Sequence, residues 1–349
     1  MKICAIISEY NPFHYGHLKH INDAKKQSGA DAVMVILSGN FTQRGEPTIV
    51  NKFVRARMAL EAGADIVVQM PTAYSTSTAE IFALAGVKIA NSFENVTHLA
   101  FGCETNNFKL LKEIAAFLND EPKEYKAKLK KYLSQGNSLV TSRVKAIEEL
   151  IKTDQVNFSE ITEVTNILEQ PNNILAIEYL KALIKTNSKI TPVFTNRKDS
   201  DYCSELENGK NSSATAVRAK LYKTNNVRKT KKMLPKFSYN LLKEEIKTFG
   251  LPDIELFNNL CMYALKTSTP EDIKKIFDVT EGLENRFFDI SRNTKNLNDF
   301  LLNVKTKRYT FTRLKRIILD CLLNITSKIE KQIYDIDVLP FIKVLAFKQ

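Results

Sequence analysis

The sequence is poor in residues that build redox or metal centres, and it has no long apolar run. Only four histidines and five cysteines occur in 349 residues, and the cysteines show no metal-ligand spacing. No stretch of about eighteen apolar residues could span a membrane, and the apolar stretch after Lys2 is too short for a secretory signal. These absences predict a cytoplasmic protein without a zinc site, a disulfide framework or a membrane anchor.

The sequence also lacks the glycine-rich loops that hold phosphates in many α/β proteins. No Gly-x-Gly-x-x-Gly follows the first apolar segment, and no Gly-x-x-x-x-Gly-Lys occurs anywhere. An apolar content of 44% with only ten prolines nevertheless favours a folded chain, long enough for two domains. Any phosphate site must therefore be built from other residues.

Short apolar segments alternate with segments of helical periodicity over the first half of the chain. The strand-like segments are residues 2–8, 32–37, 65–69, 97–101 and 190–194. This alternation predicts an α/β fold, a Rossmann-like parallel sheet with helices on both faces. We assign it to residues 1–223, with a helical insertion at about 107–186. A hinge at 223–236 leads to an α-helical domain over 237–349, in which almost no strand is expected.

The sequence His14-Tyr15-Gly16-His17 follows the first predicted strand and begins a helix. A helix start binds anions through its unpaired N–H groups, and Gly16 allows a phosphate to approach the backbone. The imidazoles of His14 and His17 would add donors to the same phosphates. A strand followed by His-x-Gly-His and then by a helix is typical of adenylate-forming and nucleotidyl-transferring enzymes. The alternative is that both histidines only cap the helix.

Residues 211–218 form a second candidate phosphate site. Ser212, Ser213 and Thr215 lie at a predicted helix start, and Arg218 follows one turn later. Hydroxyl, backbone N–H and guanidinium groups would then face one phosphate. The alternative is that a serine acts as an N-cap and nothing more.

Other polar segments follow the predicted strands at their carboxyl ends, where open α/β sheets bind ligands. They are residues 38–47, Gly102 in the segment 101–104, Asn172 at a helix start, and Arg197 after the last strand. No serine or cysteine has a histidine partner in motif form. The sequence therefore favours chemistry by positioning and charge neutralisation over a covalent nucleophile.

The net charge is +12, and its basic runs lie in the second half of the chain. One run is residues 228–232. The other comprises Lys305, Lys307, Arg308 and Arg313 with an interleaved tyrosine. This density suits a nucleic-acid backbone, although a solvated helix face is the alternative interpretation.

Taken in order, these motifs resemble the tRNA(Met) cytidine acetate ligase family of the His-x-Gly-His superfamily. The resemblance rests on residues 9–17, 38–47, 171–175, 212–215, 281–286 and 305–310, and so spans nearly the whole chain. Two places depart from the family pattern: Gln69-Met70-Pro71 replaces Glu-Leu-Pro, and Asn51-Lys52-Phe53 replaces a triplet like Asp-Lys-Trp.

The resemblance implies which residues bind ATP. It assigns this role to Gly102, Asn172 (or the adjacent Asn173), Arg197 and the segment Ile7, Ser8, Glu9, Tyr10, Asn11, Pro12, Phe13, His14, Tyr15, Gly16, His17, Leu18, Lys19 and His20. Together with the second phosphate site, it identifies His14, His17 and Arg218 as the expected catalytic residues.

The reaction that the resemblance implies has two steps. ATP, with Mg²⁺, reacts with acetate to give acetyladenylate and pyrophosphate, and the acetyl group passes to N4 of the wobble cytidine of elongator tRNA(Met). The basic domain would hold that tRNA. Two alternatives stay open: a nucleotidyltransferase acting on a small phosphorylated metabolite, and a non-catalytic RNA-binding protein.

Overall fold

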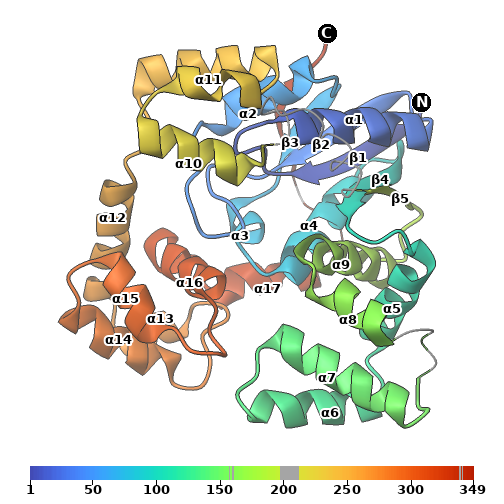
Figure 1. Cartoon of the computed structure of the whole chain (residues 1–349), viewed down its shortest axis with the longest axis vertical. Helices are drawn as coiled ribbons and strands as arrows, with labels where there is room; N and C mark the ends of the chain where they lie inside the picture. Colours follow the sequence, from blue (N-terminus) through green and yellow to red (C-terminus); the bar gives the residue numbers. More distant parts are fainter. Residues whose placement is uncertain (157, 159–160, 197–211, 338, 340) are drawn as a thin grey trace.

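A six-stranded sheet lies at the centre of the first half of the chain (Figure 1). The computed structural model describes residues 1–349 except 157, 159–160, 197–211, 338 and 340. The strands are β1 (Ile3–Ser8), β2 (Ala32–Leu37), β3 (Ile66–Gln69), β4 (Val96–Cys103), β5 (Thr191–Asn196) and β6 (Lys343–Phe347). Their order is β5-β4-β1-β2-β3-β6, and β1 to β5 are parallel. The predicted α/β fold with a parallel sheet is confirmed.

The strands are apolar on both faces, because both faces are covered by helices. On β2, Met34 and Ile36 point into one core while Val33, Val35 and Leu37 point into the other. The second of these cores contains α1 (Tyr15–Ser28), α2 (Lys52–Glu61), α10 (Ala214–Thr224) and α11 (Lys236–Phe249). The opposite core contains α3 (Thr72–Ser75), α4 (Ala79–Asn91), α5 (Phe108–Asp120) and α9 (Pro171–Lys185).

Helices fill the interval between β4 and β5. After α5 come α6 (Lys123–Ser134), α7 (Leu139–Lys152) and α8 (Ile161–Glu169), which lead into α9. The α7 residue Arg143 pairs with the buried Glu178 of α9 at 3.1 Å, and Lys181 pairs with the same carboxylate at 2.8 Å. The Arg143 pair attaches the outer helix α7 to the sheet-covering helix α9, whereas the Lys181 pair lies within α9.

The second half of the chain has a core of its own. A 3-10 helix, η2 (Val227–Met233), leads through α11 to α12 (Ile254–Thr267), α13 (Pro270–Lys274), α14 (Leu283–Asn293), α15 (Leu297–Val304) and α16 (Phe311–Leu323). Residues of α12 to α16 pack around Phe287 and Phe300. The next helix, α17 (Ser327–Asp335), returns to the first half, where Ile333 joins the core beneath α4. Within the described residues, no helix is both long and apolar enough to cross a bilayer.

The expectation of almost no strand after residue 237 is wrong for β6. This strand pairs antiparallel with β3 at the edge of the sheet, and Lys348 then pairs with Asp65 at 2.9 Å. An edge strand has only one neighbour and one partly covered face, so it does not need the continuous apolar run of a central strand. Three of the five residues of β6 are exposed and two are half-buried, so the segment lacks the pattern of a buried central strand.

Gly45 provides a test of the contact between the two halves. Its φ is +73°, and a Cβ at this position would lie 2.6 Å from the backbone carbon of Lys315 on α16. We predict that Gly45→Ala lowers the free energy of unfolding by about 3 kcal/mol, because backbone strain and a backbone clash combine. Urea denaturation measures this loss.

Gly136→Ala is the matched control, because Gly136 has a φ of +79° and no heavy atom within 4 Å of the added Cβ. It should lose only about 1 kcal/mol. Equal losses in the two variants would contradict a close contact between residue 45 and α16.

Candidate functional site

Helix α1 begins with a cap made by its two histidines. His14 is the N-cap, and its Nδ1 accepts a hydrogen bond from Gly16 N at 3.0 Å. The Nδ1 of His17 accepts from His14 N at 3.3 Å, so each imidazole caps the backbone near the other. The ring centroids lie 3.8 Å apart. A Cβ at residue 16 would lie 2.8 Å from Cε1 of His14, so a larger residue in place of Gly16 would displace that ring.

The cap fixes the hydrogen positions on both rings. Because Nδ1 accepts a hydrogen bond in each case, the neutral imidazole carries its hydrogen on Nε2. Beneath the rings, Tyr10 and Phe13 are buried, with centroids 4.8 and 5.5 Å from that of His17. The structure shows the capping interpretation: the histidines cap the helix, and the cap orients their Nε2–H groups.

A fully buried arginine, Arg55, connects the backbone around the cap. It lies on α2, and its guanidinium donates to Val50 O at 3.2 Å, to Glu9 O at 2.6 Å, to Ser38 O at 3.2 Å and to Gly39 O. The chain segments that leave β1 and β2 are thus held by one side chain. Burial lowers the pKa of Arg55 to about 10, so its charge persists at neutral pH.

Sequence reasoning did not identify Arg55. A sequence signal exists, because this arginine stands among Ala56, Met58 and Ala59 on the apolar face of a helix. A long cationic side chain at a core position needs several acceptors, and those acceptors belong to loops whose folding the sequence does not reveal.

The loop at residues 38–51 folds back on itself and onto the end of β1. Thr48 N donates to Asn40 O at 2.9 Å, and Ile49 N donates to the Asn11 side chain at 2.9 Å. The Glu9 carboxylate accepts from Gln43 N at 2.7 Å. Burial raises the pKa of Glu9, whereas this N–H bond and nearby arginines lower it. The loop and the His-x-Gly-His turn therefore form one polar rim.

The structure brings Arg218 to the same rim. Its Nη1 donates to Asn11 O at 2.8 Å, and its Nη2 donates to Thr215 Oγ1 at 3.3 Å. Ser213 is the N-cap of α10 and accepts from Ala216 N at 3.2 Å. Burial lowers the pKa of Arg218. The start of α10 and the His-x-Gly-His turn thus meet, although Ser213 also performs the capping role of the alternative interpretation.

Asn172 and Asn173 differ in their contacts at the start of α9. Asn173 is buried, accepts from Glu104 N at 2.7 Å and donates to Gln170 at 2.7 Å. Asn172 is half-buried and donates to the Glu104 carboxylate at 2.5 Å. Gly102, near the end of β4, pairs with Thr195 of β5. Arg197 lies outside the described residues.

The two departures from the family pattern lie in contact. Lys52 Nζ donates to Gln69 Oε1 at 2.8 Å, and Asn51 caps α2 through bonds from the backbone N–H groups of residues 53 and 54. Burial, together with the nearby Lys343, lowers the pKa of Lys52. A lysine–glutamine hydrogen bond therefore lies at this end of β3. Within the part of the chain the structure describes, no carboxylate forms an ion pair with the Lys52 ammonium.

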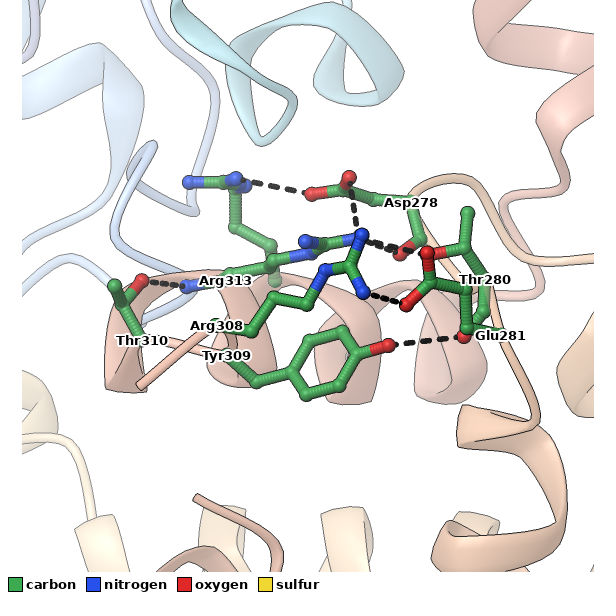
Figure 2. Close-up of polar contacts among 8 residues, drawn as sticks. Asp278, Thr280, Glu281, Arg308, Tyr309, Thr310 and Arg313 are labelled. Carbon is green, nitrogen blue, oxygen red and sulfur yellow. Dashed lines mark hydrogen bonds and ion pairs between the residues drawn. The ribbon is translucent and has the colours of Figure 1, made fainter. Parts of the chain in front are cut away.

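The basic run in the second half divides into two kinds of side chain (Figure 2). Arg308 pairs with Glu281, while Arg313 and Arg316 pair with Asp278 at 3.1 and 3.4 Å. Tyr309 donates its hydroxyl to Thr280 O at 3.0 Å. By contrast, Lys305 and Lys307 are exposed, with Lys305 Nζ 4.5 Å from the centroid of the Phe311 ring. The basic residues of the run 228–232 are exposed on η2.

The fold and the histidine-capped turn define a nucleotidyl transferase of the HIGH class, and the family model for HIGH nucleotidyl transferases matches residues 1–349. Among curated relatives, the tRNA(Met) cytidine acetate ligase of Caldicellulosiruptor saccharolyticus is 42% identical over 99% of this chain and 82% of its own length. That of Thermoanaerobacter sp. is 39% identical over 100% and 84%.

A solved structure agrees with these relatives. Thermotoga maritima TmcAL bound with alpha-thio ATP matches with a TM-score of 0.89 and 32% identity, over 99% of this chain and 80% of that one. The chain belongs to the tRNA(Met) cytidine acetate ligase family.

We predict that Arg55→Lys lowers the free energy of unfolding by about 3 kcal/mol, because an ammonium cannot reach the carbonyls that the guanidinium fork bridges. Denaturant unfolding measures this change. The control is Arg57→Lys, an exposed position on the same helix, which should stay within about 0.5 kcal/mol of wild type. A similar stability for both variants would contradict the role of Arg55 in joining the loops.

Proposed function

We propose that the chain activates acetate with ATP and transfers the acetyl group to N4 of the wobble cytidine of elongator tRNA(Met). In the first step an acetate oxygen attacks the α-phosphorus and pyrophosphate leaves. In the second the N4 amine attacks the acetyl carbonyl of acetyladenylate; a C–N bond forms, the bond to the phosphate oxygen breaks, and AMP leaves while the amine loses a proton. Acetate is a poor acyl donor until AMP is its leaving group.

The observation that carries this proposal is the pair of oriented imidazoles at the start of α1, with Arg218 beside them. Their Nε2–H groups and the guanidinium are donors for the phosphate charge that grows as pyrophosphate leaves. The cap fixes the orientation of the two imidazoles, and the Arg218–Asn11 hydrogen bond fixes the position of the guanidinium, before ATP binds. We therefore assign catalysis to His14, His17 and Arg218. The likeness to a TmcAL structure bound with alpha-thio ATP supports ATP as the nucleotide.

The remaining ATP contacts are proposed along the same edge of the sheet. Residues 7–20 surround the phosphates, and Ser212, Ser213 and Thr215 at the start of α10 complete the phosphate site. Gly102, near the end of β4, and Asn172, at the start of α9, lie where the adenosine would extend. Arg197, outside the described residues, is proposed as a further ATP contact. Asn172 is the better candidate of the two asparagines, because Asn173 is buried with both its amide oxygen and its amide nitrogen bonded, whereas Asn172 is half-buried and uses its amide nitrogen on Glu104.

Mg²⁺ would accompany ATP and offset part of its charge. Among the described residues, no group of three histidine, cysteine or carboxylate side chains is placed to hold a metal ion. A phosphate-bound Mg²⁺ needs only one or two protein ligands, and Glu9 on the rim is the nearest carboxylate to the histidine turn in the sequence. The residues present therefore fit a metal carried in by the nucleotide.

The tRNA is proposed to lie on the helices of the second half. Lys305 and Lys307 are the leading contacts, because both are exposed. The sequence predicts that Arg308 and Arg313 contact the same backbone. Because they pair with Glu281 and Asp278, we propose that they shape this surface and contribute partial charge to it. A tRNA substrate is consistent with a cytoplasmic protein.

We predict that His17→Ala lowers acetate-dependent ATP–pyrophosphate exchange by about 100-fold, the scale for loss of one transition-state donor. The control is His98→Ala, on β4 where it hydrogen-bonds Thr97, and its exchange should match wild type. Circular dichroism confirms that both variants fold. A folded His17→Ala protein with wild-type exchange would refute the assignment.

We also predict that Lys305→Ala/Lys307→Ala weakens tRNA binding and lowers the slope of log K against log salt by about one unit for each lost phosphate contact. Acetate-dependent exchange without tRNA should not change. The control pair Lys25→Ala/Lys26→Ala lies on the last turn of α1, at the other end of the helix from the histidine cap. If both double variants lower the salt slope equally, the change reflects only the lower net charge of the protein, and the assignment of Lys305 and Lys307 to tRNA contacts is contradicted.

A further inference from the structure

A cavity of about 330 Å³ lies where the first half of the chain meets the helices of the second. Its walls come from the loop at residues 45–49, from α10, and from α12, α15 and α16. In Figure 1, α12, α15 and α16 lie below α10. The volume is at the lower end of small-ligand pockets, which span about 300–1,000 Å³, so it suits a single nucleoside better than a nucleoside triphosphate.

Arg218 connects this cavity to the nucleotide site. The residue lines the cavity, yet its Nη1 also donates to Asn11 O in the turn before His14. A molecule in the cavity would therefore lie beside the residues assigned to the phosphates of the adenylate. This position suits an acceptor that must meet the activated acetyl group.

The lining has the chemistry that recognises a flat base. Tyr222, 39% exposed, and Phe257 provide aromatic rings, and Leu301 belongs to an aliphatic wall. The hydroxyl of Tyr222 donates to Pro252 O at 3.4 Å, which limits the position of its ring. Unpaired bases of RNA are commonly recognised by stacking on such aromatic side chains.

Two amides line the same cavity and can read the polar edge of a base. Asn258 is half-buried on α12, and Asn298 lies at the exposed start of α15. Neither side chain forms a hydrogen bond within the part of the chain the structure describes. An amide offers both a donor and an acceptor, so it matches the adjacent polar atoms on the Watson–Crick edge of a nucleobase.

The proposed tRNA surface leads into the cavity. Leu301 lines the cavity on α15, and the exposed Lys305 follows four residues later, about 6 Å further along a helix. An RNA backbone on Lys305 and Lys307 would therefore pass the mouth of the cavity. A flipped nucleotide could enter it without leaving that surface.

We propose that this cavity receives the acceptor nucleoside of the RNA substrate, with Tyr222 and Phe257 stacking on the base and Asn258 bonding its Watson–Crick edge. The inference rests on the proposed function and adds to it the site of the second substrate. Binding the acceptor between the two halves makes transfer depend on both of them. Adenylate formation needs only the first.

The test compares the two half-reactions in the full-length protein. Asn258→Ala and Ala219→Trp are the variants; the first removes the amide, and the second fills the cavity from an exposed position on α10. Transfer of acetyl to tRNA should fall about 10- to 100-fold, the scale of a lost bidentate base contact. The affinity for tRNA and acetate-dependent exchange should stay within about two-fold, because backbone contacts carry most of the affinity.

Asn259→Ala is the matched control, because Asn259 is the exposed neighbour of Asn258 on α12 and does not line the cavity. Wild-type transfer in Asn258→Ala and Ala219→Trp would overturn the assignment. A raised KM for acetate in the exchange reaction would also overturn it, because the cavity would then hold the acyl donor. If wild-type exchange does not require acetate, the proposed function itself fails, and this outcome is distinct from both.

Discussion

The buried charge of Arg55 is the constraint on which the rest of the site depends. A guanidinium without water must find acceptors inside the protein, and here the acceptors are backbone carbonyls of loops. Because Glu9 and Ser38 follow adjacent parallel strands, bonding both fixes how the chain leaves the sheet. The histidine turn and the loop at residues 38–51 are built on those exits, and Arg218 in turn bonds Asn11 of the turn.

The loop at residues 38–51 contacts the helical body at residues 254–323 through polar and aromatic groups. Glu46 pairs with Lys315 at 2.6 Å, the Phe41 and Phe257 rings lie 6.2 Å apart, and Gly45 touches the backbone of α16. This loop contact is separate from the apolar cores that α11 and α17 share with the sheet. The cavity lined by Arg218 lies beside this contact, where the RNA substrate would have to reach the acetyladenylate.

Much of the fold and part of the site could be predicted from the sequence, because local patterns carry them. Residues 32–37 are a strand with the bounds that their apolar run indicates, and His14 begins α1 as its position after β1 suggests. Features that depend on distant partners could not be predicted. β6 forms only by pairing with β3, which lies far away in the sequence. Arg55 is buried only because carbonyls from other loops accept its hydrogen bonds. Arg308 and Arg313 form ion pairs with acidic residues of the segment 278–281.

The position of β6 determines how the helical body at residues 254–323 can move. That body is joined to the sheet domain at two places: it leaves through α11, which packs against the core beneath α2, and it returns through α17 to β6. A body attached by one linker can swing in any direction, whereas one attached at two separate points can turn only about the line that joins them. The two attachments therefore restrict how far the helical body can move away from the sheet domain.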